Sequence, residues 1–360
     1  MRFFLFFLVL LLGLPARAAE TVRIAIVDGA TQITLAGKDL EVRHLEVGER
    51  YAPAPGGRSV VYLAKGEMML DGAPVRAVDG VKYRSQGFVR VADKPVRGEI
   101  EVRPNGKGKL IAINVIPLED YLAAVLGSEM PASFPPQALR AQAVAARTYA
   151  VHKKIGAWGK PYHLGATVLH QVYGGARAED PRTLEAVKAT EGEVLVWKME
   201  PVEAYFHSSC GGRTEDGVHA LGRKLPYLTP VDCPCSDYSH TRWTARLEAD
   251  DFKRLLAGVR DIEVQRRTPT RRADRVQLES KKGRRVVTGV ELRQVVGYSK
   301  LKSLWFEVER KGGRFVFEGR GHGHGAGMCQ WGARRLAEKG WDYRRILAHY
   351  YLGSELRKMY

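Results

Sequence analysis

The segment from Ile116 to Pro131, IPLEDYLAAVLGSEMP, predicts a short amphipathic helix that ends just before a single carboxylate, Glu129. Pro117 suits a first helical turn, and apolar residues recur at helical spacing up to residue 126. Gly127 is a natural stop signal, so Glu129 is expected just past a helix C-terminus, where the helix dipole disfavours negative charge. Partial burial there would favour the protonated carboxyl, which is the form that a general acid needs. The alternative is an ordinary exposed loop residue.

The N-terminus has the features of a secretory signal. A positive residue, a short apolar run and an Ala-x-Ala site occupy residues 1–18. The run is shorter than the roughly 20 apolar residues that span a bilayer comfortably, and no second long apolar run follows. We therefore expect cleavage, an extracytoplasmic location in the periplasm, cell wall or medium, and no transmembrane segment in the mature chain.

The chain is strongly basic, with a formal net charge of +17. The signal carries two of these charges, Arg2 and Arg17, so the mature chain keeps +15. Such a charge predicts an anionic partner. Export argues against a nucleic acid and favours a cell wall that carries peptide carboxylates or anionic polymers. The alternative is that the charge serves only solubility.

Four cysteines remain after export: Cys210, Cys233, Cys235 and Cys329. An even number in an oxidising compartment suggests disulfides, and four thiols also suit a structural zinc ion. Cys233-Pro-Cys235 is spaced more tightly than a usual zinc knuckle, and a bridge within that pair would be strained. The sequence favours bridges from these two to distant partners, with Cys210 and Cys329 as candidates, and leaves zinc open.

The expected fold class is α+β, with mixed helices and mainly antiparallel strands around a substrate cleft. Residues 19–106 have alternating and β-branched runs that predict a β-rich N-terminal region. Residues 107–360 are expected to form the catalytic domain, with an inserted α/β subdomain at about 245–318. The pattern predicts helices over 137–154, 183–190, 249–258, 290–296 and up to 338, and later strands over 193–197, 202–206, 304–308 and 314–318.

A glycine-rich loop, GRGHGHGAGMCQWG, covers residues 319–332. We reject a dinucleotide-binding fingerprint, because no βαβ unit follows and the chain is exported. Such dense glycines would let the backbone approach a polymer closely. His322 and His324 are two residues apart, so an extended backbone would turn both to one side, toward a cleft or away from it. His324 is then either a ligand or proton carrier, or a buried hydrogen-bonded histidine.

Five segments together resemble the stage II sporulation protein D family, which includes the amidase enhancer proteins of cell walls. They are PLEDYL…EMP within 117–131, AQAVAARTYA at 141–150, HQVYGG at 170–175, YFHSSCGGRTE at 205–215 and GHGHGAGMCQWGA at 321–333. The resemblance covers roughly residues 107–352, with the segments in order.

The resemblance implies a peptidoglycan lytic transglycosylase that cleaves MurNAc–GlcNAc strands, preferring those whose peptide stems an amidase has removed. It implies glycan strands and a cell-wall amidase as partners, no required cofactor, and Glu129 as the catalytic acid. It also implies further substrate-binding residues, which are Arg147, Gln171, Tyr173, His207, Ser209 and Gln330. To these we add His324 from the glycine-rich loop. Some family members bind zinc through His and Cys upstream of the Gln-x-Tyr motif; this chain has His163 and His170 there but no Cys.

One carboxyl suffices for such a reaction. A glycoside hydrolase needs an acid together with a base or nucleophile. In a lytic transglycosylase the sugar's own C6 hydroxyl attacks and gives a 1,6-anhydro end, and well-oriented intramolecular attack is worth up to ~7–11 kcal/mol. Tyr173 and Trp331 would stack on a sugar face or be core aromatics. Arg147 would hold substrate groups or be paired structurally.

Two other functions fit the sequence. One is a wall-binding module that enhances an N-acetylmuramoyl-L-alanine amidase without catalysis, which the basic charge and the N-terminal region favour. The other is a hydrolase in which Glu129 works with Glu215 or Asp216.

Overall fold

The computed structural model describes residues 20–46, 48–51, 56–75, 80–167 and 170–360. Over these residues the chain is α+β, with seven α-helices and strands that pair mostly antiparallel, which confirms the expected fold class. In the same ranges, no helix combines the length and the apolar character needed to cross a bilayer. The predicted signal at residues 1–18 lies outside the described residues.

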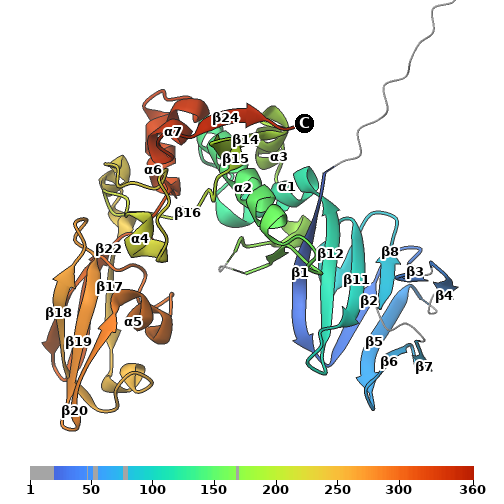
Figure 1. Cartoon of the computed structure of the whole chain (residues 1–360), viewed down its shortest axis with the longest axis horizontal. Helices are drawn as coiled ribbons and strands as arrows, with labels where there is room; N and C mark the ends of the chain where they lie inside the picture. Colours follow the sequence, from blue (N-terminus) through green and yellow to red (C-terminus); the bar gives the residue numbers. More distant parts are fainter. Residues whose placement is uncertain (1–19, 47, 52–55, 76–79, 168–169) are drawn as a thin grey trace, which may run out of the picture.

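The N-terminal region forms two sheets (Figure 1). The larger has the strand order β13-β1-β12-β11-β8-β3-β4, and the smaller has the order β10-β9-β2-β5-β6-β7. The strands are β1 (Thr21–Ala30), β2 (Gln32–Ala36), β3 (Glu41–His44), β4 (Arg50–Tyr51), β5 (Arg58–Ala64), β6 (Glu67–Leu70), β7 (Ala73–Pro74), β8 (Val81–Arg84), β9 (Val89–Val91), β10 (Lys94–Val96), β11 (Glu99–Pro104), β12 (Leu110–Pro117) and β13 (Leu164–Gly165).

A boundary at residue 106 does not separate two packed units. Strands β11 and β12 pair antiparallel, with Glu99 opposite Val115 at one end and Pro104 opposite Leu110 at the other. Residue 106 therefore lies in the turn of a hairpin. Buried residues of these sheets also share one hydrophobic core with the helices that follow. The N-terminal strands therefore pack as part of the same body as the helices.

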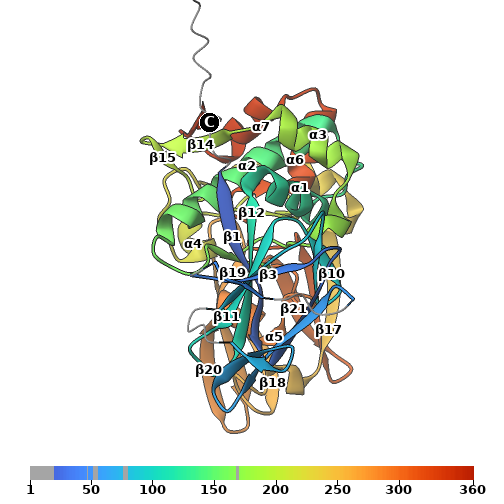
Figure 2. The ribbon, with the colours of Figure 1, turned by 90° about the vertical axis from the view of Figure 1, so that its right-hand side faces the viewer.

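The central part is helical and carries short strands at its edges. Figures 1 and 2 show these helices on one side of the molecule, with two β-rich bodies extending below them. The elements are α1 (Leu118–Glu129), α2 (Pro136–Gly156), α3 (Pro181–Ala189), β14 (Glu193–Trp197), β15 (Glu200–Pro201), β16 (Phe206–His207), α4 (Gly217–Leu221), β23 (Met328–Cys329), α6 (Gln330–Glu338), α7 (Tyr343–Tyr350) and β24 (Glu355–Lys358), with 3-10 turns η1 (Gly175–Ala178), η2 (Pro234–Asp237) and η3 (Ser239–Thr241).

Helix α1 does not stop at Gly127 as the sequence predicts. It continues to Glu129, and Met130 then turns to an extended conformation. Gly127 is required for a different reason: a Cβ there would lie 1.7 Å from the carbonyl oxygen of Ala178 in η1. The glycine therefore lets η1 approach α1, and Glu129 still occupies the C-terminal end of the helix.

The Ala-rich helix α2 lies at the centre of this part, and most of its residues from 138 to 151 are buried. Arg147 is fully buried in its middle and makes a bidentate pair with Glu119 of α1, at 2.7 and 2.6 Å. Its guanidinium also donates to the carbonyls of Val187 and Glu193, each at 3.2 Å. The predicted substrate-binding role of Arg147 is therefore corrected, because its donors are used to join α1, α2, α3 and β14.

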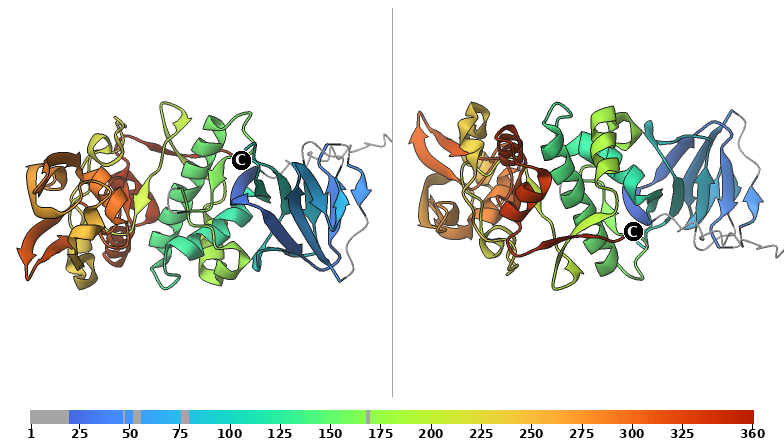
Figure 3. Two further views of the ribbon diagram at one scale, coloured as in Figure 1. Left: turned by 90° about the horizontal axis from the view of Figure 1, so that it is seen from below. Right: turned by 90° about the horizontal axis from the view of Figure 1, so that it is seen from above.

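Residues 242–320 form a separate β-rich body with one helix (Figure 3). Its two three-stranded sheets have the orders β17-β22-β21 and β18-β19-β20, and it has its own hydrophobic core. Its elements are β17 (Arg242–Leu247), η4 (Ala249–Phe252), β18 (Val259–Arg267), β19 (Ala273–Ser280), β20 (Gly283–Thr288), α5 (Gly289–Val296), β21 (Phe306–Lys311) and β22 (Arg314–Arg320).

This body spans slightly more than the predicted insertion. The chain enters it at β17 and leaves it at β22, and these strands pair with Arg242 opposite Arg320. The helix predicted over 249–258 is only the 3-10 turn η4, and of the strand predicted over 202–206 only the end is present, in β16.

The buried arginine pair predicts a large stability effect. Arg147→Met should lower the free energy of unfolding by about 3–5 kcal/mol, because it leaves the partly buried Glu119 carboxylate without its charged partner. Arg140→Met on the same helix is the matched control, since its pair with Glu185 is long (3.7 Å) and more exposed, and is worth about 0–1 kcal/mol. Urea unfolding of both variants measures this, and equal stabilities would contradict the structural role.

Candidate functional site

Glu129 lies in the wall of a cavity of about 410 Å³. The cavity is formed by residues of α1, α2 and α4, of the segments 170–172 and 205–208, of the glycine-rich loop and of the body of residues 242–320. The lining residues are Glu129, Tyr149, His170, Val172, Tyr205, Phe206, His207, Ser208, Ala220, Leu221, Val290, Arg293, Tyr298, Leu304, His322, Gly323 and His324.

The Glu129 carboxyl is half-buried at the end of α1 and accepts one hydrogen bond from the protein. The backbone N–H of Val172 donates to its Oε1 at 2.6 Å. Burial raises the pKa of Glu129 above its ordinary value, and the hydrogen bond from Val172 opposes part of this rise. The surroundings therefore favour the protonated form and hold it in a defined orientation, as a general acid requires.

Val172 holds this position because its two neighbours are fixed in the core. Gln171 accepts a hydrogen bond from the Tyr121 hydroxyl at 3.0 Å and donates to the carbonyl of Ala146 at 3.2 Å. The Tyr173 hydroxyl donates to the side chain of Asn114 at 2.8 Å. Both side chains are buried and neither lines the cavity, so the sequence-based assignment of Gln171 and Tyr173 to substrate binding is corrected.

His207 lines the cavity, as its predicted role requires. Its Nδ1 lies 3.0 Å from the carbonyl oxygen of Ala326, so Nδ1 carries the hydrogen and donates. Its Nε2 is then an acceptor that is buried and has no partner in the described structure. Burial lowers the pKa of His207 well below its ordinary value, so the ring stays neutral. His207 thus lines the cavity as a neutral ring whose Nε2 atom is shielded from solvent.

His324 also lines the cavity, but both of its ring nitrogens are used within the protein. Nδ1 accepts from the backbone N–H of Ala326 at 3.1 Å, so Nε2 carries the hydrogen that it donates to the carbonyl of Phe206 at 2.9 Å. Burial lowers the pKa of His324 to about 4. The structure therefore favours the buried, hydrogen-bonded alternative over a proton carrier. His322 lines the same cavity, so the two histidines do face one side.

Three other predicted residues lie outside the cavity. Ser209 is buried and its hydroxyl contacts the sulfur of Cys235 at 3.5 Å. Gln330 is buried and donates to Gln142 at 3.4 Å. Trp331 packs between Phe134 and Tyr238, with ring centroids 4.9 Å from each. These placements correct the assignment of Ser209 and Gln330 to the substrate cleft, and they favour the core-aromatic alternative for Trp331.

The glycine-rich loop lies along the chain's own segment 205–210 rather than along an open surface. Gly321, Gly323 and Gly327 all have positive φ, and a Cβ on each would collide with that segment. The nearest atoms would be the Ser209 carbonyl oxygen at 2.8 Å, the His207 Cβ at 2.6 Å and the Tyr205 carbonyl oxygen at 2.0 Å, respectively. The close approach expected for a polymer is thus used to pack one cavity wall.

Several cavity residues were not predicted as site residues. Tyr149 lies within the AQAVAARTYA segment, and its ring packs 5.5 Å from that of Tyr205. Arg293 and Tyr298 come from the body of residues 242–320, and the Arg293 guanidinium is held by the carbonyls of Leu301 and Lys302, each at 2.8 Å. Tyr149 and Tyr205 lie in segments that carry the family resemblance, so the sequence could have indicated them. No local pattern indicates that the inserted body, with Arg293 and Tyr298, lines this cavity.

The two candidate second carboxylates do not line the cavity. Glu215 is buried and accepts from the hydroxyls of Thr268 and Thr270 at 2.7 and 2.6 Å, which join the body of residues 242–320 to the main body. Asp216 caps α4 by accepting from the backbone N–H of Val218 at 2.7 Å. Among the described residues that line the cavity, Glu129 is therefore the sole acid.

The four cysteines converge in one buried cluster, with their Sγ atoms all within 4.8 Å of one another. Within the described ranges this is the sole group of three or more potential ligands close enough to hold a metal ion. His163 and His170 do not form such a group. His163 accepts from the backbone N–H of Arg23 at 3.2 Å, and His170 lines the Glu129 cavity.

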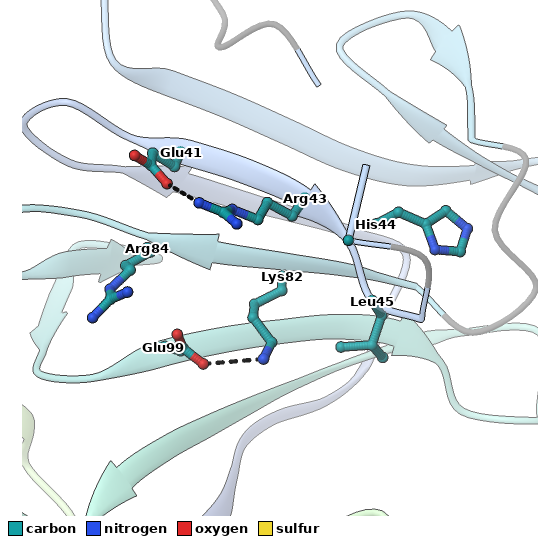
Figure 4. Close-up of a pocket in the computed structure, with 8 residues that line it drawn as sticks. Glu41, Arg43, His44, Leu45, Lys82, Arg84 and Glu99 are labelled. Carbon is teal, nitrogen blue, oxygen red and sulfur yellow. Dashed lines mark hydrogen bonds and ion pairs between the residues drawn. The ribbon is translucent and has the colours of Figure 1, made fainter. Parts of the chain in front are cut away.

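A smaller cavity of about 240 Å³ lies on the large N-terminal sheet (Figure 4). Charged side chains of β3, β8 and β11 line it, and two ion pairs cross it, Glu41–Arg43 and Lys82–Glu99, each at 3.1 Å. It shares no residue with the Glu129 cavity. Because both of its acids are already paired with cations, the Glu129 cavity is the better candidate for catalysis.

Comparison with known proteins gives two family matches. Residues 106–197 match the stage II sporulation protein family (SpoIID), and residues 237–327 match a domain of unknown function (DUF8618). The second match coincides with the separate body of residues 242–320.

Three relatives are similar to this chain over about two thirds of its length. An uncharacterised protein of Brachyspira hyodysenteriae is 31% identical over 255 residues, which is 69% of this chain and 68% of that protein. The stage II sporulation protein D of Bacillus amyloliquefaciens is 32% identical over 68% of this chain and 75% of its own length. The amidase enhancer of Bacillus subtilis is 30% identical over 65% of this chain and 40% of its own length.

The packing of the glycine-rich loop predicts a difference between two similar glycines. Gly327 (φ +70°) and Gly353 (φ +72°) have the same backbone strain for an L-residue, but a Cβ meets the Tyr205 carbonyl only at Gly327. Gly327→Ala should therefore destabilise the fold by about 1–3 kcal/mol more than Gly353→Ala, because the blocking atom is backbone. Thermal unfolding of both variants measures the difference, and equal losses would refute this account of the loop.

Proposed function

The chain belongs to the stage II sporulation protein D family, and from that premise we propose that it is an exported peptidoglycan lytic transglycosylase. It cleaves the MurNAc–GlcNAc linkage of glycan strands and leaves 1,6-anhydro-MurNAc ends. Glu129 is its single catalytic residue. The observation that carries this proposal is a cavity with one carboxyl whose pKa is raised by burial and which faces no second acid among the described lining residues.

The reaction needs one proton from Glu129, and Glu129 takes a proton back at the end of the turnover. Protonated Glu129 gives its proton to the glycosidic oxygen as the bond from that oxygen to C1 of MurNAc breaks. The C6 hydroxyl oxygen of the same MurNAc then bonds to C1, and its proton passes to the Glu129 carboxylate. Water is not consumed, and the acid is regenerated for the next turnover. A hydrolase would instead need a second carboxyl to activate water.

The rest of the cavity supports a saccharide substrate. Tyr149, Tyr205 and Tyr298 supply aromatic surface for sugar faces, and the neutral His207 ring forms part of the same wall. Arg293 places a positive charge at the wall, and burial lowers the pKa of Arg293 only to about 10, so it remains charged. These groups orient the glycan strand so that the C6 hydroxyl of MurNAc attacks C1 of the same sugar.

The net charge and the predicted signal support a wall-associated partner. A mature chain of charge +15 is attracted to anionic wall polymers and to stem-peptide carboxylates. One relative carries the name amidase enhancer, which favours a cell-wall amidase as a working partner. The alternative function is a non-catalytic, wall-binding enhancer of such an amidase, and product analysis separates it from the enzyme.

The first test compares two carboxyl-to-amide variants. Glu129→Gln should abolish release of 1,6-anhydro ends from peptide-stripped glycan, a loss of at least ~100-fold, because it removes the general acid. Asp216→Asn is the matched control: asparagine also caps helices well, so α4 is kept and activity should remain. Mass spectrometry of the products measures both. Full activity in Glu129→Gln, or loss in Asp216→Asn, would overturn the single-acid assignment.

The same substitution predicts a gain in stability. Because burial raises the folded-state pKa of Glu129, the folded state binds this proton more tightly than the unfolded state, and stability contributed by the group falls as pH rises through its raised pKa. Glu129→Gln keeps an oxygen for the N–H of Val172 and removes the buried charge. Its melting temperature near neutral pH should therefore equal or exceed that of the wild type. A clear decrease would mean that the carboxylate stabilises the fold.

The activity should also depend on pH in one direction. With the pKa of Glu129 raised by burial, kcat/KM should fall as pH increases through that value, since the acid form is lost. Burial lowers the pKa values of all four cavity histidines, so we assign the alkaline limb to Glu129. Turnover of denuded glycan across a pH series measures it; activity that rises with pH through this limb would contradict the acid role.

A further inference from the structure

The four cysteines form a compact, fully buried cluster beside the cavity wall. They come from three separate segments: Cys210 follows β16, Cys233 and Cys235 lie at η2, and Cys329 ends β23. Every Sγ lies within 4.8 Å of the other three, and the sulfurs of Cys210 and Cys235 are 3.4 Å apart. A tetrahedral Zn²⁺ with Zn–S bonds of ~2.3 Å needs sulfurs ~3.8 Å apart, which this cluster fits.

The groups around the sulfurs suit thiolates rather than disulfide sulfurs. Backbone N–H groups of Cys210 and Gly332 both point at the Cys329 sulfur, each at 3.3 Å. The Ser209 hydroxyl donates to the Cys235 sulfur at 3.5 Å, and the Tyr350 hydroxyl lies 3.1 Å from the Cys233 sulfur. Such outer-shell hydrogen bonds are typical of metal-bound cysteine.

Space and charge next to the cluster agree with this arrangement. Gly332 leaves room for it, because a Cβ there would lie 2.3 Å from the Cys233 sulfur. The buried Arg272 donates to the carbonyl of Cys210 at 2.9 Å, which places a cation beside the sulfurs. A zinc ion with four thiolates carries a net charge of −2, and a buried cation partly offsets it.

We propose that Cys210, Cys233, Cys235 and Cys329 bind one structural Zn²⁺ that fixes the cavity wall carrying His207. With four protein ligands the site is closed, so the ion has no open position for substrate or water. It joins segment 205–210, η2 and the start of α6, and Cys329 pairs directly with His207 in the parallel contact of β16 with β23. This inference is independent of the reaction catalysed at Glu129.

The first experiment uses the wild-type mature chain, purified from the exported fraction without added metal. Native mass spectrometry and elemental analysis should find one zinc per chain. No thiol should react with a thiol reagent in the folded protein, and all four should react after unfolding in chelator without reductant. A metal-free chain about 4 Da lighter than its fully reduced mass, with no thiol released without reductant, would establish two disulfides and overturn the proposal.

A second experiment separates the two chemistries by stability. A strong chelator should lower the melting temperature of the wild type. A reductant without thiol groups, at equal concentration, should not. The opposite pattern is the disulfide result and contradicts zinc. Since both measurements use the wild type, they hold even where a cysteine variant fails to fold.

Variants then place the ion. Cys235→Ser should lose the zinc and increase the reactivity of His207 toward a histidine reagent, because the wall is no longer fixed. Ser236→Ala is the matched control on the next, exposed residue of η2, and it should retain one zinc and the wild-type melting temperature. Full zinc retention in Cys235→Ser would refute the four-cysteine site.

Discussion

The close contact between the glycine-rich loop and segment 205–210 holds the candidate site together. Strands β16 and β23 pair in parallel, and two histidines link the segments reciprocally: His207 donates to the carbonyl of Ala326, and His324 donates to that of Phe206. These residues are about 120 positions apart in the sequence, and the body of residues 242–320 lies between them. Only a backbone without Cβ atoms approaches this closely, which explains the glycines at positions 321, 323 and 327.

This contact also sets the electrostatics around Glu129. The four cavity histidines, His170, His207, His322 and His324, all have pKa values lowered chiefly by burial, so they add no positive charge beside the acid at neutral pH. Burial therefore dominates the pKa of Glu129, and the hydrogen bond from Val172 is too weak an opposing influence to reverse it. The site therefore combines a carboxyl whose pKa is raised by burial with uncharged histidines, an arrangement that suits proton donation.

The sequence predicted this acid because its signals are local: an amphipathic helix, its end and a carboxylate at that end. It misassigned Arg147, Gln171 and Tyr173 because a motif marks that a residue matters without saying which way its side chain points. In HQVYGG the side chains of Gln171 and Tyr173 anchor the strand-like segment in the core, and the working atom is the backbone N–H of Val172 between them. Such a role has no side-chain signature.

Long-range packing explains the remaining differences. The stop signal at Gly127 is real as a propensity, but η1 needs the space of a Cβ there, and the helix continues to Glu129. The spacing of Cys233 and Cys235 argued against a zinc knuckle, but the fold brings Cys210 and Cys329 from distant segments into one cluster with them. The contribution of Arg293 and Tyr298 depends on how an inserted body folds back on the main one.

The central claim is that the C6 hydroxyl of the substrate itself, and not water, attacks C1 when Glu129 protonates the glycosidic oxygen. Cleavage of peptide-stripped glycan in water enriched in oxygen-18 tests it most directly, with the new MurNAc ends analysed by mass spectrometry. The account predicts ends that lack the mass of water and carry no heavy oxygen. New reducing ends that each carry one oxygen-18 atom would contradict it and indicate a hydrolase.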